Sequence, residues 1–212
     1  MFHVSKPLVS VITPTIASRH ELLLNRCIPS VQAQAYPKVE HVIVSHADPE
    51  LAGKMAELAS GTAFYHPVRL VQLEGPHPGG NLYGSEARLA GIEESKGGYI
   101  AYIDDDDALR PEHCAKLAAV LDDDLSLMWA YSLMASHSNS GLSTHIGAPV
   151  PAFGQIGTPM IVHRREALEH GTWGPPSSAE DWQLVERWLG AGLPYGRVHE
   201  ATVDVWPSAY WG

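Results

Sequence analysis

A chain of 212 residues can form one fair-sized domain or two small ones, and 45% hydrophobic against 18% charged residues is the balance of a globular protein with a sizeable core. The formal net charge of -10 argues against a nucleic-acid backbone or an anionic membrane as the main partner. The sequence has neither a recognisable signal peptide nor an apolar stretch of about 18 residues, so we expect a cytoplasmic protein with no membrane span.

The first half of the chain alternates between two kinds of pattern. Apolar runs rich in β-branched residues predict buried strands at residues 8–13, 40–46, 68–73 and 99–103. Apolar residues at helical spacing predict helices at residues 18–34, 48–60, 82–98 and 110–124. Pro29 should kink the first helix, because proline lacks the N–H that a helix interior needs. The alternation indicates an α/β fold, with a mainly parallel central sheet flanked by helices.

The second half is less regular. We expect a long strand at residues 125–136, a loop rich in Gly, Pro and Ser at 139–159, a strand and short helix at 159–171, a helix at 178–192, and a last strand or two at 195–206. Neither a repeat nor a linker separates these elements, so we expect a single domain over residues 1–212. Cys27 and Cys114 fall in predicted helices and are expected to be buried, reduced thiols.

Four consecutive aspartates, Asp104 to Asp107, follow the fourth predicted strand. In open α/β sheets, ligands bind beyond the carboxyl ends of the strands. Neighbouring carboxylates repel one another, and a hard divalent cation such as Mg²⁺ or Mn²⁺ would stabilise them. The alternative is an acidic turn in which Asp107 caps the next helix. A second acidic run, Asp122 to Asp124, follows a helix and is expected to be a polar turn without a ligand.

The order of these segments resembles that of the family 2 glycosyltransferases, which have the GT-A fold, a Rossmann-like α/β domain. The resemblance rests on "SVQAQAYPKVEHVIV", "GSEARLAGI", "GGYIAYIDDDD" and "HRREALEHGTWGPPSSAEDWQLVERW", which follow one another in the family's order. It implies a metal-dependent, inverting glycosyltransferase. Residues 1–107 would then be the nucleotide-binding half and residues 108–212 the acceptor-binding half.

The resemblance also implies roles for residues on the donor side. Asp106 would bind Mn²⁺ or Mg²⁺ on the diphosphate of a nucleotide sugar, with Asp104 as a further metal contact, and Asp104 or Asp105 would face the ribose or a metal-bound water. Arg88 would bind the nucleotide, and an arginine suits phosphate because its fork of N–H groups never deprotonates. The base and ribose would rest against the end of the first strand, at Pro14 and Thr15, with Arg19 nearby.

On the acceptor side, the resemblance makes Asp181 the general base. It would take the proton from an acceptor hydroxyl as that oxygen attacks the anomeric carbon, and this single displacement would invert the configuration there. The positive end of the predicted helix would help to keep Asp181 ionised. The alternative is that Glu180 and Asp181 are only first-turn acids that suit the helix dipole.

Two segments depart from the family's pattern. At the end of the second strand, where paired aspartates are common, this chain has Ser45 and His46. His46 should weaken uridine preference or make it depend on pH, because an imidazole accepts a hydrogen bond only while unprotonated, although Asp48 could substitute. The segment "VDVWPSAY" lacks a tyrosine-arginine-x-histidine pattern found in many members. His199 is therefore considered as a third metal ligand, with a structural histidine as the alternative.

We therefore expect the chain to bind a UDP-, dTDP- or GDP-sugar and an unidentified hydroxyl acceptor, with a homo-oligomer as one way to complete the acceptor site. Two other functions stay open. A nucleotidyltransferase with a related α/β core would also need an acidic metal site, but "TPTIASRHE" is not its usual Gly-rich, basic first loop. The second alternative is a non-catalytic module that binds sugar nucleotides.

Overall fold

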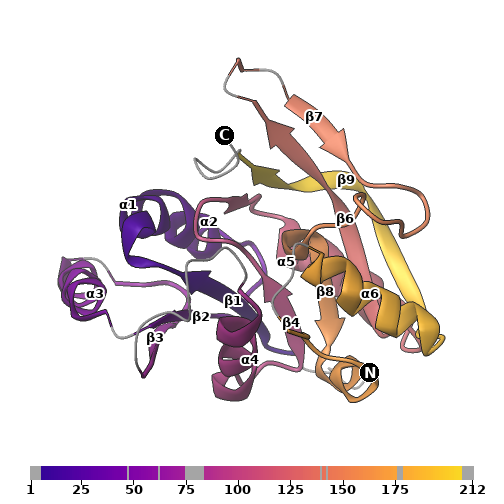
Figure 1. Cartoon of the computed structure of the whole chain (residues 1–212), viewed down its shortest axis with the longest axis horizontal. Helices are drawn as coiled ribbons and strands as arrows, with labels where there is room; N and C mark the ends of the chain where they lie inside the picture. The colour runs from indigo at the N-terminus through magenta and orange to yellow at the C-terminus, as the bar shows by residue number, and fades with distance from the viewer. Residues whose placement is uncertain are drawn as a thin grey trace.

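A single sheet runs through the protein, in the strand order β3-β2-β1-β4-β8-β6-β9-β5, with β7 hydrogen-bonded to β6. The computed structural model describes residues 6–46, 48–61, 63–74, 84–138, 140–141, 143–175 and 179–206. Helices lie on both faces of the sheet (Figure 1). The α/β prediction is therefore confirmed.

The first half of the sheet is parallel, as predicted. It consists of β1 (Val9–Thr15), β2 (Val39–His46), β3 (Val68–Leu73) and β4 (Tyr99–Tyr102). β1 lies between β2 and β4, and the backbone N–H of Ile103 donates to the carbonyl of Ile12 at 3.1 Å. The carboxyl ends of β1 and β4 therefore meet at one edge, and Asp104 to Asp107 begin there.

The second half of the sheet is mixed. β8 (Ile161–Arg164) is antiparallel to both β4 and β6 (Trp129–His137), whereas β9 (Tyr195–Val205) is parallel to β6. Two short strands were not predicted: β5 (Ala108–Leu109) pairs with β9, and β7 (Ser143–Ile146) pairs with β6. β7 lies in the stretch predicted as a loop. Three of its four residues are exposed, so it has no apolar pattern that would indicate a strand.

Four helices have the positions that the sequence predicts, with shifted ends. They are α3 (Pro49–Gly61), α4 (Ser85–Glu94), α5 (His113–Asp123) and α6 (Glu180–Gly190), and short 3₁₀ helices occupy η3 (Thr158–Met160) and η4 (Arg165–His170). Within the described ranges, none of the helices is both long enough and apolar enough to cross a bilayer.

The first predicted helix is divided into four short segments, of which two are α-helical, one is a 3₁₀ turn and one is a π-helical turn. They are the 3₁₀ turn η1 (Ala17–Arg19), the α-helical turn α1 (His20–Leu22), the π-helical turn η2 (Leu23–Cys27) and α2 (Ile28–Gln32). The N–H of Ile28 donates to the carbonyl of Leu23, five residues earlier, immediately before Pro29. The irregularity that Pro29 predicts is thus a π-helical turn.

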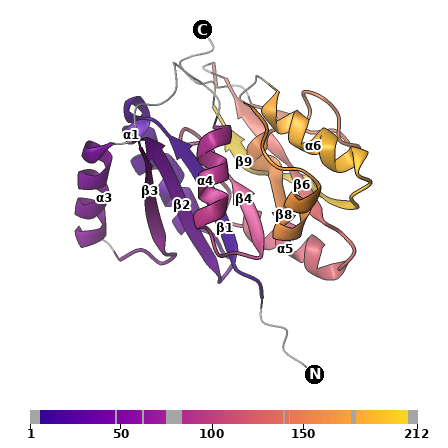
Figure 2. The same cartoon turned by 60° about the horizontal axis from the view of Figure 1, so that its bottom comes forward.

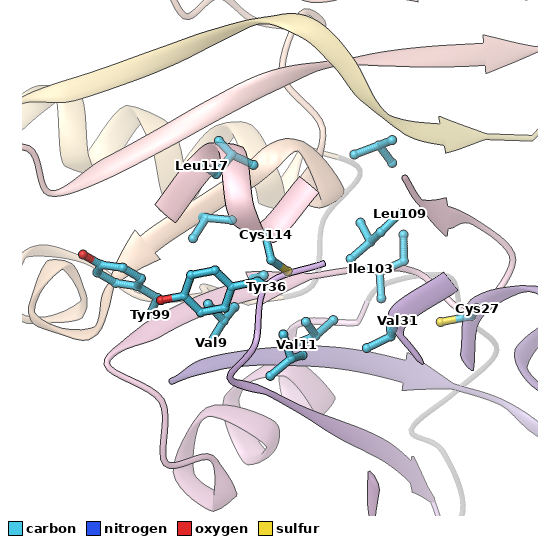
Figure 3. Close-up of a cluster of buried hydrophobic side chains, with 14 of the residues drawn as sticks. Val9, Val11, Cys27, Val31, Tyr36, Tyr99, Ile103, Leu109, Cys114 and Leu117 are labelled. Carbon is cyan, nitrogen blue, oxygen red and sulfur yellow. The ribbon is translucent and has the colours of Figure 1, made fainter. Parts of the chain in front are cut away.

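Apolar residues of β1 alternate between the two faces of the sheet and so enter two different cores. Val9 and Val11 pack in the core that α2 and α5 cover, together with Val31, Cys114 and Leu117 (Figure 3). Both cysteines are buried and free, as predicted.

The opposite face packs beneath α4 and α6 (Figure 2). Ile12 and Val44 of the sheet contact this core, to which α4 contributes Ile92 and α6 contributes Trp188. The two helices that carry Arg88 and Asp181 therefore lie on the same face of the sheet.

Close packing of α4 on the sheet requires a glycine at position 91. A Cβ atom there would lie 2.5 Å from Cγ2 of Ile12 and 3.2 Å from Cγ2 of Val44. By contrast, nothing lies within 4 Å of a Cβ built at the exposed Gly53 of α3.

We therefore expect Gly91→Ala to lower the free energy of unfolding by about 1–2 kcal/mol, because overpacking outweighs the gain in helix propensity. The matched change Gly53→Ala should raise it by about 0.5–1 kcal/mol, since only the propensity changes. Urea unfolding of both variants measures the difference. Equal stabilisation by both would show that α4 does not pack this closely on β1.

Candidate functional site

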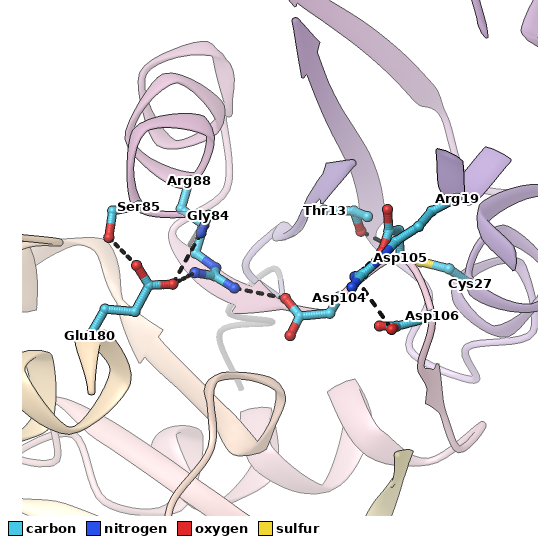
Figure 4. Close-up of polar contacts among 10 residues, drawn as sticks. All are labelled: Thr13, Arg19, Cys27, Gly84, Ser85, Arg88, Asp104, Asp105, Asp106 and Glu180. Atoms are coloured by element: carbon cyan, nitrogen blue, oxygen red, sulfur yellow. Dashed lines mark hydrogen bonds and ion pairs between the residues drawn. The ribbon is translucent and has the colours of Figure 1, made fainter. Parts of the chain in front are cut away.

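The aspartate run at the end of β4 is largely buried, and each of its residues has at least one polar partner. Asp105, Asp106 and Asp107 are 2%, 7% and 6% exposed, whereas the side chain of Asp104 is 36% exposed. Much of the charge is compensated by arginine side chains from other elements (Figure 4). The run is therefore not a simple acidic turn on the surface.

Asp105 faces the end of β1. Its carboxylate accepts a hydrogen bond from Thr15 Oγ1 at 2.7 Å and another from Arg19 Nη1 at 3.0 Å. Burial raises the pKa of Asp105 to about 6, against the opposing effects of Arg19 and Thr15. Thr15 and Arg19, both expected near the nucleotide, are thus brought together at the acid run.

Asp106 and Asp107 contact two further residues, Arg26 and Trp206. Arg26 Nη1 donates to the backbone carbonyl of Asp106 at 2.6 Å, and Arg19 Nη1 lies 3.3 Å from Oδ2 of the Asp106 carboxylate. The carboxylate of Asp107 accepts from the backbone N–H of Trp206 at 3.1 Å. Burial raises the pKa of Asp106, and burial together with the charges of Asp104 and Asp106 raises that of Asp107 well above its ordinary value.

Asp104 belongs to an ion-paired bridge between the two halves of the sheet. Arg88 of α4 donates through Nη2 to Asp104 at 2.7 Å and through Nη1 to Glu180 at the start of α6. Glu180 also accepts from the side chain of Ser85 and from the N–H of Gly84 at 3.1 Å, so it contacts the N-terminus of α4 (Figure 4). We call Asp104, Arg88 and Glu180 the central bridge.

Arg88 is only 3% exposed, and its guanidinium carbon lies 4.7 Å from the centre of the Trp173 ring. The sequence places Arg88 on the nucleotide. The structure places it in the site, where its two terminal nitrogens contact Asp104 and Glu180. A contact between Arg88 and a nucleotide stays a prediction.

Asp181 follows Glu180 in the first turn of α6, and one of its carboxylate oxygens accepts from the N–H of Trp182 at 2.7 Å. Burial raises the pKa of Asp181, and Asp104 and Glu180 raise it further, while the Trp182 N–H and Arg88 oppose them. The N–H at the start of α6 favours the ionised carboxylate, in the direction expected, but burial has the larger effect on the pKa. Asp181 is close enough to the acid run to be affected by the charge of Asp104.

Residues at the ends of β1 and β2 lie beside the start of α4, next to the acid run. A Cβ at Gly84 would lie 2.8 Å from Cγ of Pro14, so the start of α4 approaches Pro14 closely. The side chain of His46 is 11% exposed, with Nε2 4.0 Å from a carboxylate oxygen of Glu86. Pro14 and His46 thus border the start of α4, which Gly84 precedes.

Both carboxylate oxygens of Asp48 contact other residues of the protein. One carboxylate oxygen accepts from the N–H of Leu51 at 3.0 Å, which caps α3, and the other lies 2.6 Å from Nε2 of His20. Asp48 is 7% exposed. The idea that Asp48 substitutes for a carboxylate at position 46 is therefore not supported by its surroundings.

His199 is not brought to the acid run. It is exposed on β9, five residues before Asp204, which pairs with Ala108 beside the run. Five strand residues span about 16 Å, too far for a metal ligand. Among the residues that the structure describes, no group of three or more His, Cys, Asp or Glu side chains is arranged to hold a metal ion. The loop "PHPGGN" lies outside the described residues.

Sequence reasoning missed two residues of the site, Arg26 and Trp206. Arg26 has no motif around it, and its direction depends on the π-helical turn η2. Trp206 lies in "VDVWPSAY", a segment that was noted only for what it lacks. Glu180 was considered a first-turn acid of α6, whereas its carboxylate contacts the N-terminus of α4.

Known structures share this fold. S. aureus TarS, residues 1–349, has a TM-score of 0.70 at 18% identity, over 93% of this chain and 60% of that one. The mannosyltransferase PcManGT from Pyrobaculum calidifontis has a TM-score of 0.71 at 16% identity, over 95% and 57%. This chain thus spans about 60% of each of these two solved chains, and 37% of the longer TarS structure.

A family model, glycosyl transferase family 2, matches residues 10–161. The match covers more than half of the sequence, and the chain belongs to this family. An uncharacterized protein of Sinorhizobium fredii, y4gI, is 32% identical over 118 residues, which are 55% of this chain and 12% of that protein. The resemblance seen in the sequence is therefore confirmed.

The central bridge generates a prediction about stability. Replacing Arg88 by methionine leaves the buried Glu180 carboxylate without its cation, which should cost about 3–5 kcal/mol of unfolding free energy. Adding Glu180→Gln should recover part of this loss, because the uncompensated charge is then gone. Chemical denaturation of the single and double variants measures the coupling.

Arg69→Met provides the control. Arg69 and Glu94 form an ion pair with side chains 39% and 54% exposed. Removal of this exposed ion pair should lower the free energy of unfolding by less than about 1 kcal/mol. If Arg88→Met lowers the free energy of unfolding by no more than Arg69→Met does, the central bridge does not contribute to stability as proposed.

Proposed function

We propose that this chain transfers a sugar from a nucleoside-diphosphate sugar to an acceptor hydroxyl, with inversion at the anomeric carbon. The central bridge is the observation that carries the proposal, because it joins the acid run to the start of α6 and so brings Asp181 to the same site. Family membership supports the reaction class. TarS has been solved in complex with UDP-GlcNAc, and PcManGT in complex with GDP-Man and Mn²⁺.

Asp106 and Asp104 would hold a divalent cation. Carboxylate oxygens are the hard ligands that Mg²⁺ and Mn²⁺ prefer, and such ions commonly complete their coordination with water and substrate phosphate oxygens. The donor set of the acid run therefore fits. When bound, the ion would offset the negative charge that develops on the diphosphate leaving group.

The remaining chemistry belongs to side chains of this chain. Thr15, Arg19 and Asp105 would contact the donor nucleotide at the end of β1, with Pro14 and His46 beside them. Asp181 would accept the acceptor hydroxyl's proton on a carboxylate oxygen while the hydroxyl oxygen attacks the anomeric carbon and the diphosphate leaves from the opposite face. The raised pKa of Asp181 brings its basicity nearer to working pH, which favours general-base catalysis.

Several finer points stay predictions. They are the choice among UDP-, dTDP- and GDP-sugars, the acceptor, the cytoplasmic location, the division into halves at residue 107 and any homo-oligomer. A non-catalytic module that binds sugar nucleotides would share the donor site, and it differs from the proposed enzyme only in turnover.

The metal site is tested by Asp106→Asn. UDP or GDP with Mn²⁺ should stabilise the native chain against thermal unfolding, by about 2.7 kcal/mol at a hundredfold excess over the dissociation constant. Asp106→Asn should remove most of the Mn²⁺-dependent part and leave the fold intact. Asp123→Asn, in the exposed acidic run at the end of α5, should change nothing. Equal effects of the two variants would exclude Asp106 as a specific metal ligand.

Chemistry is separated from binding by Asp181→Asn. Donor affinity should stay within a few-fold, while release of nucleoside diphosphate from a panel of nucleotide sugars should fall by roughly 10²-fold or more. Glu186→Gln, an exposed acid on the same helix, is the control and should keep the native rate. A near-native rate in Asp181→Asn would place the base elsewhere, and binding without turnover in the native chain would favour the non-catalytic module.

A further inference from the structure

Arg26 and Trp206 form a stack beside the acid run, and neither has a role in the proposed reaction so far. The guanidinium carbon of Arg26 lies 4.1 Å from the centre of the Trp206 ring. On the tryptophan, His137 stacks with its ring centre 4.8 Å away and its plane inclined by 21°. We call Arg26, Trp206 and His137 the three-layer stack.

The stack contacts the acid run through two hydrogen bonds to successive residues. Arg26 donates to the carbonyl of Asp106 at 2.6 Å, and the N–H of Trp206 donates to the carboxylate of Asp107 at 3.1 Å. Within the run, the N–H of Asp107 donates to the carbonyl of Asp104 at 3.2 Å, which closes a tight turn. The orientation of that turn therefore depends on Arg26 and Trp206.

The π-helical turn η2 delivers Arg26 to this position. Successive residues of an α-helix are about 100° apart around its axis, so the extra residue of a π-helical turn rotates the neighbouring side chains by about that angle. Arg26 lies inside the turn, whose closing bond runs from Ile28 to Leu23. π-helical turns are rare and often occur at functional sites, which agrees with a specific task for Arg26.

The outer layer of the stack is anchored independently. His137 Nε2 lies 2.8 Å from Asp204 Oδ1, and Arg110 donates to both oxygens of the same carboxylate at 2.9 and 2.8 Å. On its other side, Nδ1 of His137 lies 2.7 Å from the hydroxyl of Ser143 on β7. The ring of Trp206 thus contacts both a fixed imidazole and the Arg26 guanidinium.

We propose that Arg26 and Trp206 are positioning residues, which hold the Asp106–Asp107 end of the acid run in the arrangement that receives a divalent cation and a nucleoside diphosphate. The inference rests on the proposed function of the acid run. Arg26 acts through the peptide carbonyl of Asp106, and Trp206 through its own N–H and by covering the Arg26 guanidinium. Residues that orient metal ligands typically change metal affinity 10–100-fold when replaced.

The test is thermal unfolding of the full chain at a fixed UDP concentration, with a parallel GDP series, across a range of Mn²⁺ concentrations. Arg26→Met keeps an unbranched side chain to pack on Trp206 but removes the hydrogen bond. It should raise the half-maximal Mn²⁺ concentration roughly tenfold or more. Trp206→Ala, which keeps the backbone N–H but removes the ring, should shift it in the same direction, and Trp206→Phe, which retains a stacked ring, should stay within about twofold.

Arg164→Met is the matched control. Arg164 also lies over an aromatic ring, that of Tyr99 at 5.4 Å, and donates to the carbonyls of Leu127 and Leu121 at 2.8 and 2.6 Å. It pairs with the amino end of β4, at the opposite edge of the sheet from the acid run. Its replacement should lower the melting temperature without ligand and leave the Mn²⁺ dependence unchanged.

The outcomes separate the two proposals. If neither UDP nor GDP stabilises the native chain with Mn²⁺, the proposed function fails and the positioning role fails with it. If the native chain responds but Arg26→Met and Trp206→Ala keep its Mn²⁺ dependence, or if Arg164→Met shifts it equally, only the positioning role is overturned. Should Arg26→Met not fold, the contrast between Trp206→Ala and Trp206→Phe decides.

Discussion

Compensation of the buried aspartate run by arginines is the interaction on which the candidate site depends. Arg88, Arg19 and Arg26 come from α4, η1 and η2, and they contact Asp104, Asp105 and the carbonyl of Asp106, respectively. Burying carboxylates without such partners would be very costly. Each pairing also fixes the position of the element that supplies the arginine. The contacts that compensate the charge of the aspartates therefore also determine the geometry of the site.

The central bridge extends this arrangement across the sheet. A helix N-terminus favours negative charge, and at α4 that charge is supplied by Glu180 from the chain's own second half. Because Glu180 and Asp181 are neighbours, the contact that neutralises Arg88 also orients the proposed base. The proposed donor and acceptor sides are thus joined by a buried ion pair as well as by the shared sheet.

Much of the fold could be predicted from the sequence, because the length and the β-branched composition of the segments that form β1 to β4 indicate buried strands. The acid run was singled out because carboxylates follow a buried strand, whereas Asp181 was singled out by the family resemblance, since acids at a helix start are common. Arg26 could not be found that way, since its direction depends on a π-helical turn. Trp206 acts through its backbone N–H and its ring, which no local pattern reveals. His199 was considered as a ligand because "VDVWPSAY" lacks the histidine of the family's pattern, and the register of β9 separates it from the run.

The order of the partners along the chain bears on how the protein assembles as it is synthesised. Arg19, Arg26 and Arg88 all precede the aspartates in sequence, so the cations are already made when the acid run emerges. Glu180 and Trp206 come 92 and 99 residues after their partners, Arg88 and Asp107. The arginine contacts of Asp104 and Asp105 therefore need only residues that are already made at that point, whereas Asp181 takes up its position only after the segment around Glu180 has been synthesised.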